Sequence, residues 1–413
     1  MSRSTLIVPL LALACTLAPV ELSAQVTPVR DVFRISPQSY GSAEPGRYET
    51  HPPSAAALAD GTFVVAWEED LEVEPPGEPS VHFEDLYARK VAADGAIGRL
   101  ARVERGNIEP EPGNPDLAAD GQGGFVLAWE QSSQGVSDVL YQSVPADQFA
   151  HRGGTSVQTV GTGLSLRYPA VAANAEGDWV IAWEEKPTFE DFGADLGIRA
   201  FRASGEPATP VIRIESSGLE QSLIQPRVAM QSDGSFMVIW RVADPQGLPR
   251  LQGRTYAADG TPLSPILQIA PVASAWKVVA GDPARGEFLV AWSRSTSDPV
   301  RVRRYAPEGT RLATTVLGRS QIIWNLSANH QGDLVFLWTE ANGTVRARLL
   351  NQNAVFQGPP FLVTRIVDEF WLGDISISDT GRIFAAWVAQ GEVTTPGGAT
   401  HRPVVGKIWQ VEE

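Results

Sequence analysis

The stretch GTFVVAW, residues 61–67, decides the fold, because the chain repeats it with small changes seven times. The other copies are GGFVLAW (123–129), GDWVIAW (177–183), GSFMVIW (234–240), GEFLVAW (286–292), GDLVFLW (332–338) and GRIFAAW (381–387). Their final tryptophans recur at nearly even spacing, from Trp67 to Trp387. A period of this size predicts repeated supersecondary units that stack on one another.

Each unit is predicted to contain four strands. A short apolar run comes first, then a turn dipeptide such as Asp60-Gly61 or Asp233-Gly234, and then the tryptophan strand. Such dipeptides supply the left-handed backbone that a tight hairpin needs. The tryptophan strand is apolar on both faces, so both faces must be covered, and in a propeller the two neighbouring blades cover them. Two further strands complete an antiparallel meander.

The two ends of the chain predict how the ring closes. After Trp387 there is one more strand-like run, PVVGKIWQ (403–410), and no fourth, whereas VFRIS (32–36) precedes the first unit. We therefore predict an all-β, seven-bladed β-propeller of four-stranded antiparallel blades, closed by an N-terminal strand in the last blade, which removes exposed sheet edges. The alternative is an open array of small sandwiches with unpaired end copies.

The repeat resembles one that is common in exported bacterial proteins, of the form P-x-V-A-x-x-x-D-G-x-F-V-V-x-W followed by Q-R-F-x-A-x-G. The likeness covers nearly the whole chain after Ala24. It implies the β-propeller fold and an exported protein, and it implies no single activity. The Asp/Gly-rich loop that follows the tryptophan in many members of that family is absent from this sequence.

The N-terminal segment has the pattern of a secretory signal. Arg3 precedes an apolar stretch from Leu6 to Val20, and Leu22-Ser23-Ala24 ends in a small residue that suits cleavage. We predict a signal peptide over 1–24, a propeller over 29–413, and an exported protein that is secreted, periplasmic or on the cell surface. Lipid anchoring at Cys15, the only cysteine, is the alternative, and without Cys15 no disulfide can form.

The formal charge of −15 limits the partners. It disfavours phosphate backbones and anionic membranes, so nucleic acid is not expected as a partner. No other segment is long and apolar enough to predict a transmembrane span. We expect a monomer whose partner is a neutral glycan or a protein.

Aromatic residues give the first candidate site. Trp324 stands 14 residues before its repeat tryptophan, as Pro53, Pro115, Pro169 and Pro226 do in the first four units, and Trp276 and Trp371 stand 16 residues before theirs. Since the first strand of a blade lines the axis, these indoles and Tyr168 are predicted to bind a ligand near one channel mouth, by stacking on sugars or cations. The alternative is that the indoles plug the channel or pack between blades.

Acidic residues give the second candidate site. Glu68, Asp70, Glu184 and Asp191 lie where the second strand runs into the third, on the same predicted face. Such carboxylates could bind calcium or act as an acid and base pair on a glycan. The D-x-D-x-D-G spacing and histidine metal motifs are missing, so we predict no metal site and no cofactor, with calcium as a weak alternative. A solvated acidic rim is the simplest interpretation.

A third candidate is the arginine that recurs in the third strand, at Arg89, Arg199, Arg254, Arg303 and Arg348. It could pair with Glu68, Glu130 and Glu184 across strands, and a residue that recurs in most blades favours a structural role. No once-only catalytic motif is present. The sequence therefore favours a non-catalytic exported propeller that binds a glycan or protein through its loop face. The alternative is a glycan-cleaving enzyme, a glycoside hydrolase or lyase, with carboxylates on that face.

Overall fold

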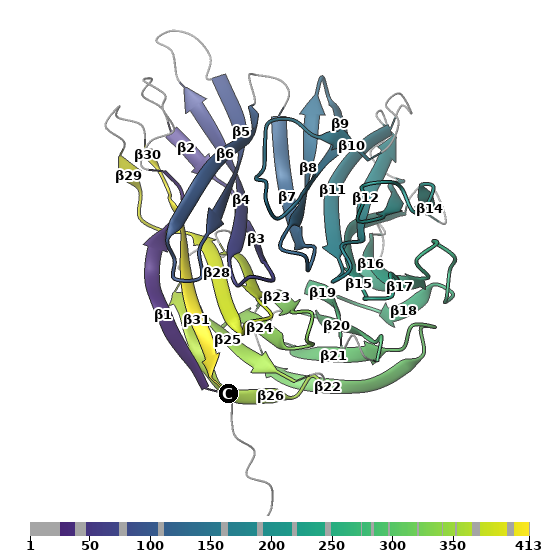
Figure 1. Ribbon diagram of the computed structural model, residues 1–413. Helices are drawn as coiled ribbons and strands as arrows, with labels where there is room; N and C mark the ends of the chain where they lie inside the picture. The colour runs from purple at the N-terminus through teal and green to yellow at the C-terminus, as the bar shows by residue number, and fades with distance from the viewer. Residues whose placement is uncertain are drawn as a thin grey trace, which may run out of the picture.

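Seven four-stranded antiparallel blades form a closed ring in the computed structural model (Figure 1). It describes residues 25–37, 47–73, 81–105, 111–157, 164–187, 193–216, 221–243, 249–273, 275–281, 285–295, 298–319, 322–340, 342–351, 353–365, 372–394 and 400–412. All regular secondary structure in these ranges is β-strand. The prediction of a seven-bladed propeller is confirmed, and an open array is ruled out.

The first three blades follow the predicted meander. Blade one contains β3 (Ser54–Ala57), β4 (Phe63–Val73), β5 (Val81–Val91) and β6 (Ile97–Arg105). Its sheet is extended at β4 by β2 (Arg47–Thr50), β30 (Thr400–His401) and β29 (Val393–Thr394). Blade two contains β7 (Glu111–Ala119), β8 (Phe125–Ser133), β9 (Val136–Val144) and β10 (Thr155–Ser156), and blade three β11 (Leu164–Ala173), β12 (Trp179–Pro187), β13 (Asp195–Phe201) and β14 (Ile212–Ile214).

The next three blades repeat this order. Blade four contains β15 (Ser222–Met230), β16 (Phe236–Ala243), β17 (Arg250–Tyr256) and β18 (Leu267–Ala270). Blade five contains β19 (Ala275–Ala280), β20 (Phe288–Ser293), β21 (Pro299–Tyr305) and β22 (Arg311–Arg319), and blade six β23 (Ile322–Ala328), β24 (Leu334–Thr339), β25 (Thr344–Leu350) and β26 (Phe356–Arg365).

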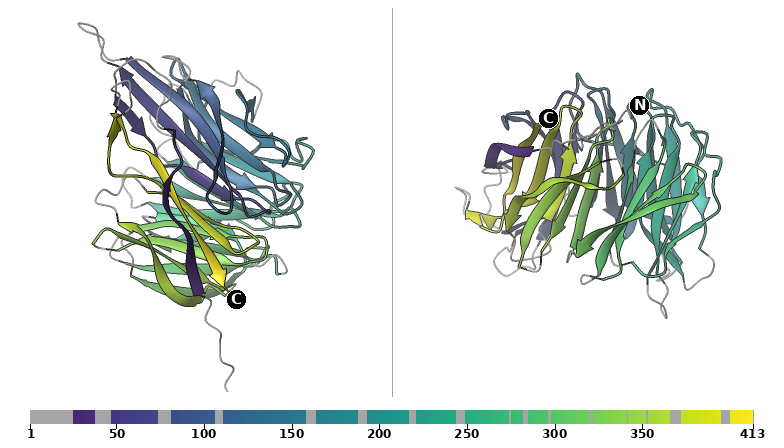
Figure 2. Two further views of the ribbon diagram at one scale, coloured as in Figure 1. Left: turned by 60° about the vertical axis from the view of Figure 1, so that its left-hand side comes forward. Right: turned by 90° about the horizontal axis from the view of Figure 1, so that it is seen from below.

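Blade seven joins the two ends of the chain. It contains β27 (Leu372–Ile377), β28 (Arg382–Val388), β31 (Val404–Glu412) and, outermost, β1 (Gln25–Arg34). β1 pairs antiparallel with β31, with Phe33 opposite Gly406, and the two strands lie side by side in Figures 1 and 2. The predicted closure by the N-terminal strand is therefore confirmed.

The core lies between blades. Clusters of buried apolar residues combine two neighbouring sheets, such as Ala182 and Leu196 of blade three with Val238 and Trp240 of blade four. The repeat tryptophans Trp67, Trp129, Trp183 and Trp240 are fully buried. The innermost strands contact their neighbours around the ring and enclose a central channel. Small side chains, mainly alanine, let these seven strands converge on the axis.

Candidate functional site at the channel mouth

The inner strands of blades two, three and four each carry a β-bulge just before a proline. The register shifts between Gly113 and Asp116 in β7, with equivalent shifts in β11 and β15. The residues that precede the prolines, Asn114, Tyr168 and Gln225, have φ of 51°, 50° and 53°. This left-handed conformation is uncommon outside glycine, so the surroundings must stabilise it.

A glutamate from the preceding blade stabilises each bulge. Glu68, Glu130 and Glu184 directly follow the repeat tryptophans of blades one to three, and each is buried, with 6 to 8% of its surface exposed. The backbone N–H of Asn114 donates to Glu68 (3.3 Å), that of Tyr168 to Glu130 (3.3 Å) and that of Gln225 to Glu184 (2.5 Å). We call these three residues the glutamate arc.

Burial keeps part of the glutamate arc protonated. It raises the pKa of Glu68 from 4.5 to about 8, and the Asp70 and Glu130 carboxylates add to the effect. Burial likewise raises the pKa of Glu184 to about 7. Glu84, opposite Asp70 in the ladder, also has a pKa raised to about 7, first by burial and then by the charge of Glu68. These carboxyls therefore titrate near neutral pH.

Two members of the glutamate arc share one partner but differ in their surroundings. Asn114 gives its backbone N–H to Glu68 and its side-chain amide to Glu130, 3.1 Å away. Glu130 also has the Arg167 guanidinium at 3.8 Å, whereas Glu68 has the His51 imidazole Nε2 at 3.5 Å. Tyr168 lies beside Glu130 with 42% of its surface exposed. Two glutamates that share Asn114 thus lie at the mouth, and one of them, Glu130, is beside the exposed Tyr168.

A ring of equivalent residues lies just below the bulges, and all of them except Ser54 line the channel cavity. Each faces, across its ladder, the residue before the repeat tryptophan. The seven are Ser54, Asp116, Ala170, Arg227, Lys277, Asn325 and Asp374.

Four ring residues bind the backbone of the next blade. Asn325 donates to the Ile375 carbonyl (3.2 Å), and Asp374 accepts from the Ala55 N–H (3.2 Å). In the same way Ser54 accepts from Leu117 (3.1 Å) and Asp116 accepts from Val171 (2.8 Å). We call these contacts ring latches. Burial raises the pKa of Asp374 to about 6, while the Lys277 charge lowers it.

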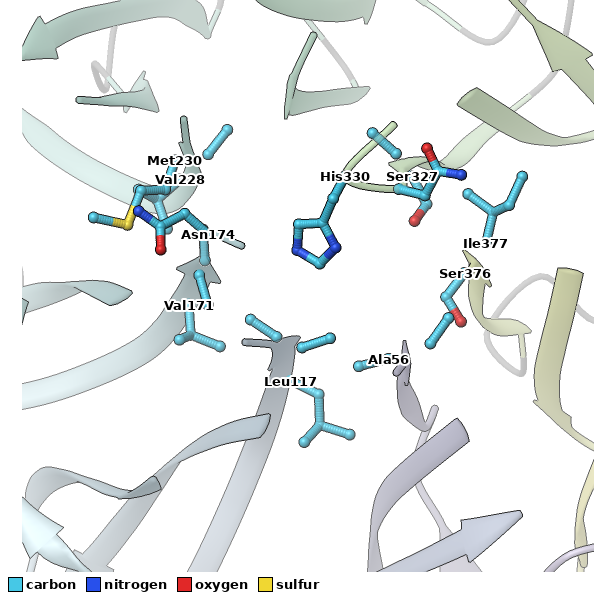
Figure 3. Close-up of a pocket in the computed structure, with 18 of the residues that line it drawn as sticks. Ala56, Leu117, Val171, Asn174, Val228, Met230, Ser327, His330, Ser376 and Ile377 are labelled. Atoms are coloured by element: carbon cyan, nitrogen blue, oxygen red, sulfur yellow. The ribbon is translucent and has the colours of Figure 1, made fainter. Parts of the chain in front are cut away.

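At the opposite end of the channel, His330 points toward the axis. Its ring lies near the middle of the circle of lining residues in Figure 3. Its Nδ1 is 3.0 Å from the Asp379 carboxylate, which also accepts the His330 backbone N–H at 2.8 Å. The channel contains a cavity of about 190 Å³, lined by inner-strand residues of all seven blades.

The predicted aromatic platform is only partly described. Trp276 and Trp324 stand directly before the ring residues Lys277 and Asn325, but Trp276 pairs with Trp292 in the ladder, whereas Trp324 lies in a bulge between Ile323 and Asn325. In blade seven Gly373 holds this position, and Trp371 lies outside the described residues. Tyr168 is at the mouth and exposed. A ligand platform of three indoles stays a prediction.

The predicted acidic residues lie in different settings. Glu68 and Glu184 belong to the glutamate arc, and Asp70 faces Glu84 between β4 and β5. Asp191 lies outside the described residues, as do the predicted signal peptide and Cys15. Glu130 was not among the predicted acidic site residues, although its place after Trp129 gave the signal for it.

The recurring third-strand arginine is structural, but its predicted partner is wrong. Arg199 donates to the Val157 carbonyl (2.8 Å) and Arg254 to the Ser264 carbonyl (3.0 Å). In the ladder of blade one, Glu68 faces Leu86, whereas Arg89 faces Val65, further along the strand. The arginine therefore lies away from the level of the arc and fastens the outer part of the sheet to backbone carbonyls.

The described ranges contain neither a metal-binding cluster nor a membrane-spanning helix. They contain no group of three or more His, Cys, Asp or Glu side chains arranged to hold a metal ion. They also contain no helix that is long and apolar enough to cross a membrane.

Comparison with known proteins identifies similar folds. No family model and no curated protein sequence matches the chain. Similar structures include an α-L-arabinanase of Penicillium chrysogenum (14% identity, 81% of this chain and 99% of that one, TM-score 0.46) and an α-L-arabinofuranosidase of Fusarium graminearum (14%, 80% and 98%, TM-score 0.44). The Dos1 propeller is also similar (9%, 93% and 95%, TM-score 0.49).

These comparisons correct the sequence-based preference for a non-catalytic binding propeller. The arabinanase and the arabinofuranosidase are glycan-cleaving enzymes, so the alternative prediction, a glycan-cleaving enzyme, agrees with them better. At such low identity the likeness extends only to the fold. Any chemistry must therefore come from this chain's own residues.

Proposed function

We propose that this protein is a glycoside hydrolase whose acid and base are Glu68 and Glu130. The observation that carries the proposal is that Asn114 joins two glutamates of contrasting environment beside the exposed Tyr168. Pairs of carboxyl groups whose environments differ in this way divide the acid and base roles in glycan cleavage.

Each residue has a defined role in this proposal. Glu68, with its pKa near 8, is protonated at neutral pH and gives its proton to the glycosidic oxygen. Glu130, beside the Arg167 guanidinium, either activates a water molecule or attacks the sugar. Tyr168 offers a face on which the apolar side of a sugar ring stacks. Asn114 is a positioning residue, since it binds both carboxyl groups.

The test is the release of reducing sugars from a panel of plant and bacterial polysaccharides. Glu68→Gln and Glu130→Gln should each lower kcat/KM by about 10² to 10⁴-fold on any substrate that is cleaved. Glu206→Gln, an exposed glutamate in a turn of blade three, is the matched control. The activity should fall as pH rises through about 8, where Glu68 loses its proton. Full activity in Glu68→Gln would overturn the assignment, and unsaturated products would indicate elimination in place of hydrolysis.

A further inference from the structure

The mouth carries a second set of charges, opposite in sign to the glutamate arc. Arg241 takes the position after Trp240 where blades one to three have glutamate. Arg227 and Lys277 occupy two consecutive ring positions and line the channel cavity. We call Arg227, Arg241 and Lys277 the basic patch.

The two arginines of the basic patch share one face of blade four. Arg227 lies opposite Ile239 in the ladder, and Arg241 is the next residue but one after Ile239. Because side chains alternate along a strand, all three point to the same side. Ile239 packs with Phe288 and Val290 of blade five, so both guanidinium groups are directed to the space between blades four and five, at the mouth.

Within the described part of the chain, Arg227 interacts with Glu184 and Lys277 with Asp374, in both cases beyond ion-pair distance. None of the three has a carboxylate within ion-pair distance there. The hydrogen bond found for Arg227 goes to the carbonyl of its neighbour Pro226 (2.8 Å). The Nε of Arg241 is buried and has no hydrogen-bond partner among the described residues. A partly buried cation without a direct ion pair is costly, which favours an anion from outside.

The local structure explains why, among the described residues, the basic patch makes no hydrogen bonds to the backbone of the next blade. The arc glutamates accept the bulge N–H of the next inner strand, but β19 of blade five pairs with β20 without a bulge. Blade four therefore needs no acceptor at this position. Arg227, Arg241 and Lys277 also make none of the ring latches. The basic patch thus makes none of the interblade hydrogen bonds that the glutamate arc and the ring latches make in the other blades.

We propose that Arg227, Arg241 and Lys277 bind the carboxylate of an acidic glycan, so that the substrate contains uronic acid residues. This inference rests on the proposed glycosidase function, because the glutamate arc and the basic patch adjoin at the same mouth. Arg227 lies close enough to Glu184 for their charges to interact. A chain that crosses the mouth would thus place an acidic sugar on blades four and five and its neighbour at the arc. Guanidinium and ammonium groups are the usual partners of carboxylates.

The test is a calorimetric titration with a trimer of α-1,4-linked galacturonic acid and with the methyl ester of the same trimer. The acid should bind both the wild-type protein and Glu68→Gln, and the uncharged ester should bind at least about tenfold more weakly. Arg227→Gln and Lys277→Gln should each weaken binding of the acid about tenfold or more, and Arg227→Lys should restore part of it. Arg99→Gln, an exposed arginine on β6, is the charge-matched control. Added salt should weaken binding of the acid.

Several results would overturn the inference. The ester could bind as tightly as the acid, or the patch variants, folded by circular dichroism, could bind like the wild type. Inorganic phosphate could also displace the trimer at equal concentration, which would indicate a site for any small anion. Cleavage of neutral glycans without binding of the acid trimer would overturn this inference alone. Binding of the acid trimer without cleavage of any glycan would overturn the proposed hydrolase and leave the carboxylate site standing.

Discussion

Blades one to three and blades four and five build the same channel mouth with opposite charges. In the first group the residue after the repeat tryptophan is Glu68, Glu130 or Glu184, and each accepts a bulge N–H from the next blade. In the second group the equivalent residues are Arg241 and Ser293, and the inner strand that follows blade four has no bulge. The difference teaches that each of these glutamates serves a bulge in the next inner strand. After blade four the next inner strand has no bulge, and there the position carries Arg241.

The ring latches divide the molecule in the same way. They join blade six to seven, seven to one, one to two and two to three. At the remaining three interfaces the ring residue is Ala170, Arg227 or Lys277, and the described contacts include no such latch there. The ring latches therefore concentrate on one side of the mouth, and the cations Arg227 and Lys277 lie on the other.

The largest expected effect is the loss of a fully buried repeat tryptophan. Trp183→Ala should lower the free energy of unfolding by about 3–5 kcal/mol, because its ring is fully buried and packs against Gly197. Trp338→Ala, in blade six, should cost less, since Trp338 is partly exposed. Urea unfolding of both variants makes the comparison. A loss below about 1 kcal/mol for Trp183→Ala would contradict its role in the core.

Loss of a ring latch should lower the free energy of unfolding less than loss of a repeat tryptophan, and more than loss of Arg227. Asp116→Ala should cost about 1–3 kcal/mol, because the Val171 N–H loses its acceptor. Arg227→Ala should change the free energy of unfolding by no more than about 0.5 kcal/mol, since the described contacts give it no ion pair. The two variants are compared by denaturant unfolding at one pH. Equal losses in the free energy of unfolding would show that ring latches do not stabilise one side of the ring more than the other.

The glutamate arc predicts a pH dependence of stability. The folded state holds the Glu68 proton up to about pH 8, whereas the unfolded chain releases it near 4.5. This contribution is complete below about pH 4.5 and is lost as pH rises to about 8. Glu68→Gln should therefore be more stable than wild type at pH 8 by roughly 1–2 kcal/mol, and close to it at pH 4. Unfolding curves from pH 4 to 9 measure this, with Glu206→Gln as control, and parallel curves for all three proteins would show that Glu68 is not held protonated.

The smallest expected effect comes from adding a ring latch at the interface of blades three and four, where the described contacts include none. Ala170→Ser should let a hydroxyl accept the N–H of Val228 in blade four, as Ser54 accepts that of Leu117. The gain should be about 0.5–1 kcal/mol. Thermal unfolding and amide exchange at Val228 detect it. Unchanged exchange at Val228 would mean that the hydroxyl does not reach this amide.

Much of the fold could be predicted from the sequence, while the site could be predicted only in part. The repeat around Trp67 and the orphan strand at 32–36 were enough for seven blades and their closure. The prolines at 53, 115, 169 and 226 marked the inner strands, but nothing in the sequence showed that a bulge precedes them. For that reason Glu68 and Glu184 were predicted as rim residues, when they are buried acceptors. The total charge of −15 also hid the basic patch, because a sum carries no information about position.

The sequence by itself determined the repeat, the strand pattern, the number of blades and the strand that completes the last one. These follow from local periodicity, since alternating apolar side chains and turn residues act over a few neighbours. Only the tertiary structure decided which residues meet across blades, such as Glu68 with Asn114 and Asp374 with Ala55. The reason is that these pairs lie far apart along the chain and meet through the curvature of the ring. That curvature depends on how whole sheets pack, and no single stretch of sequence records it.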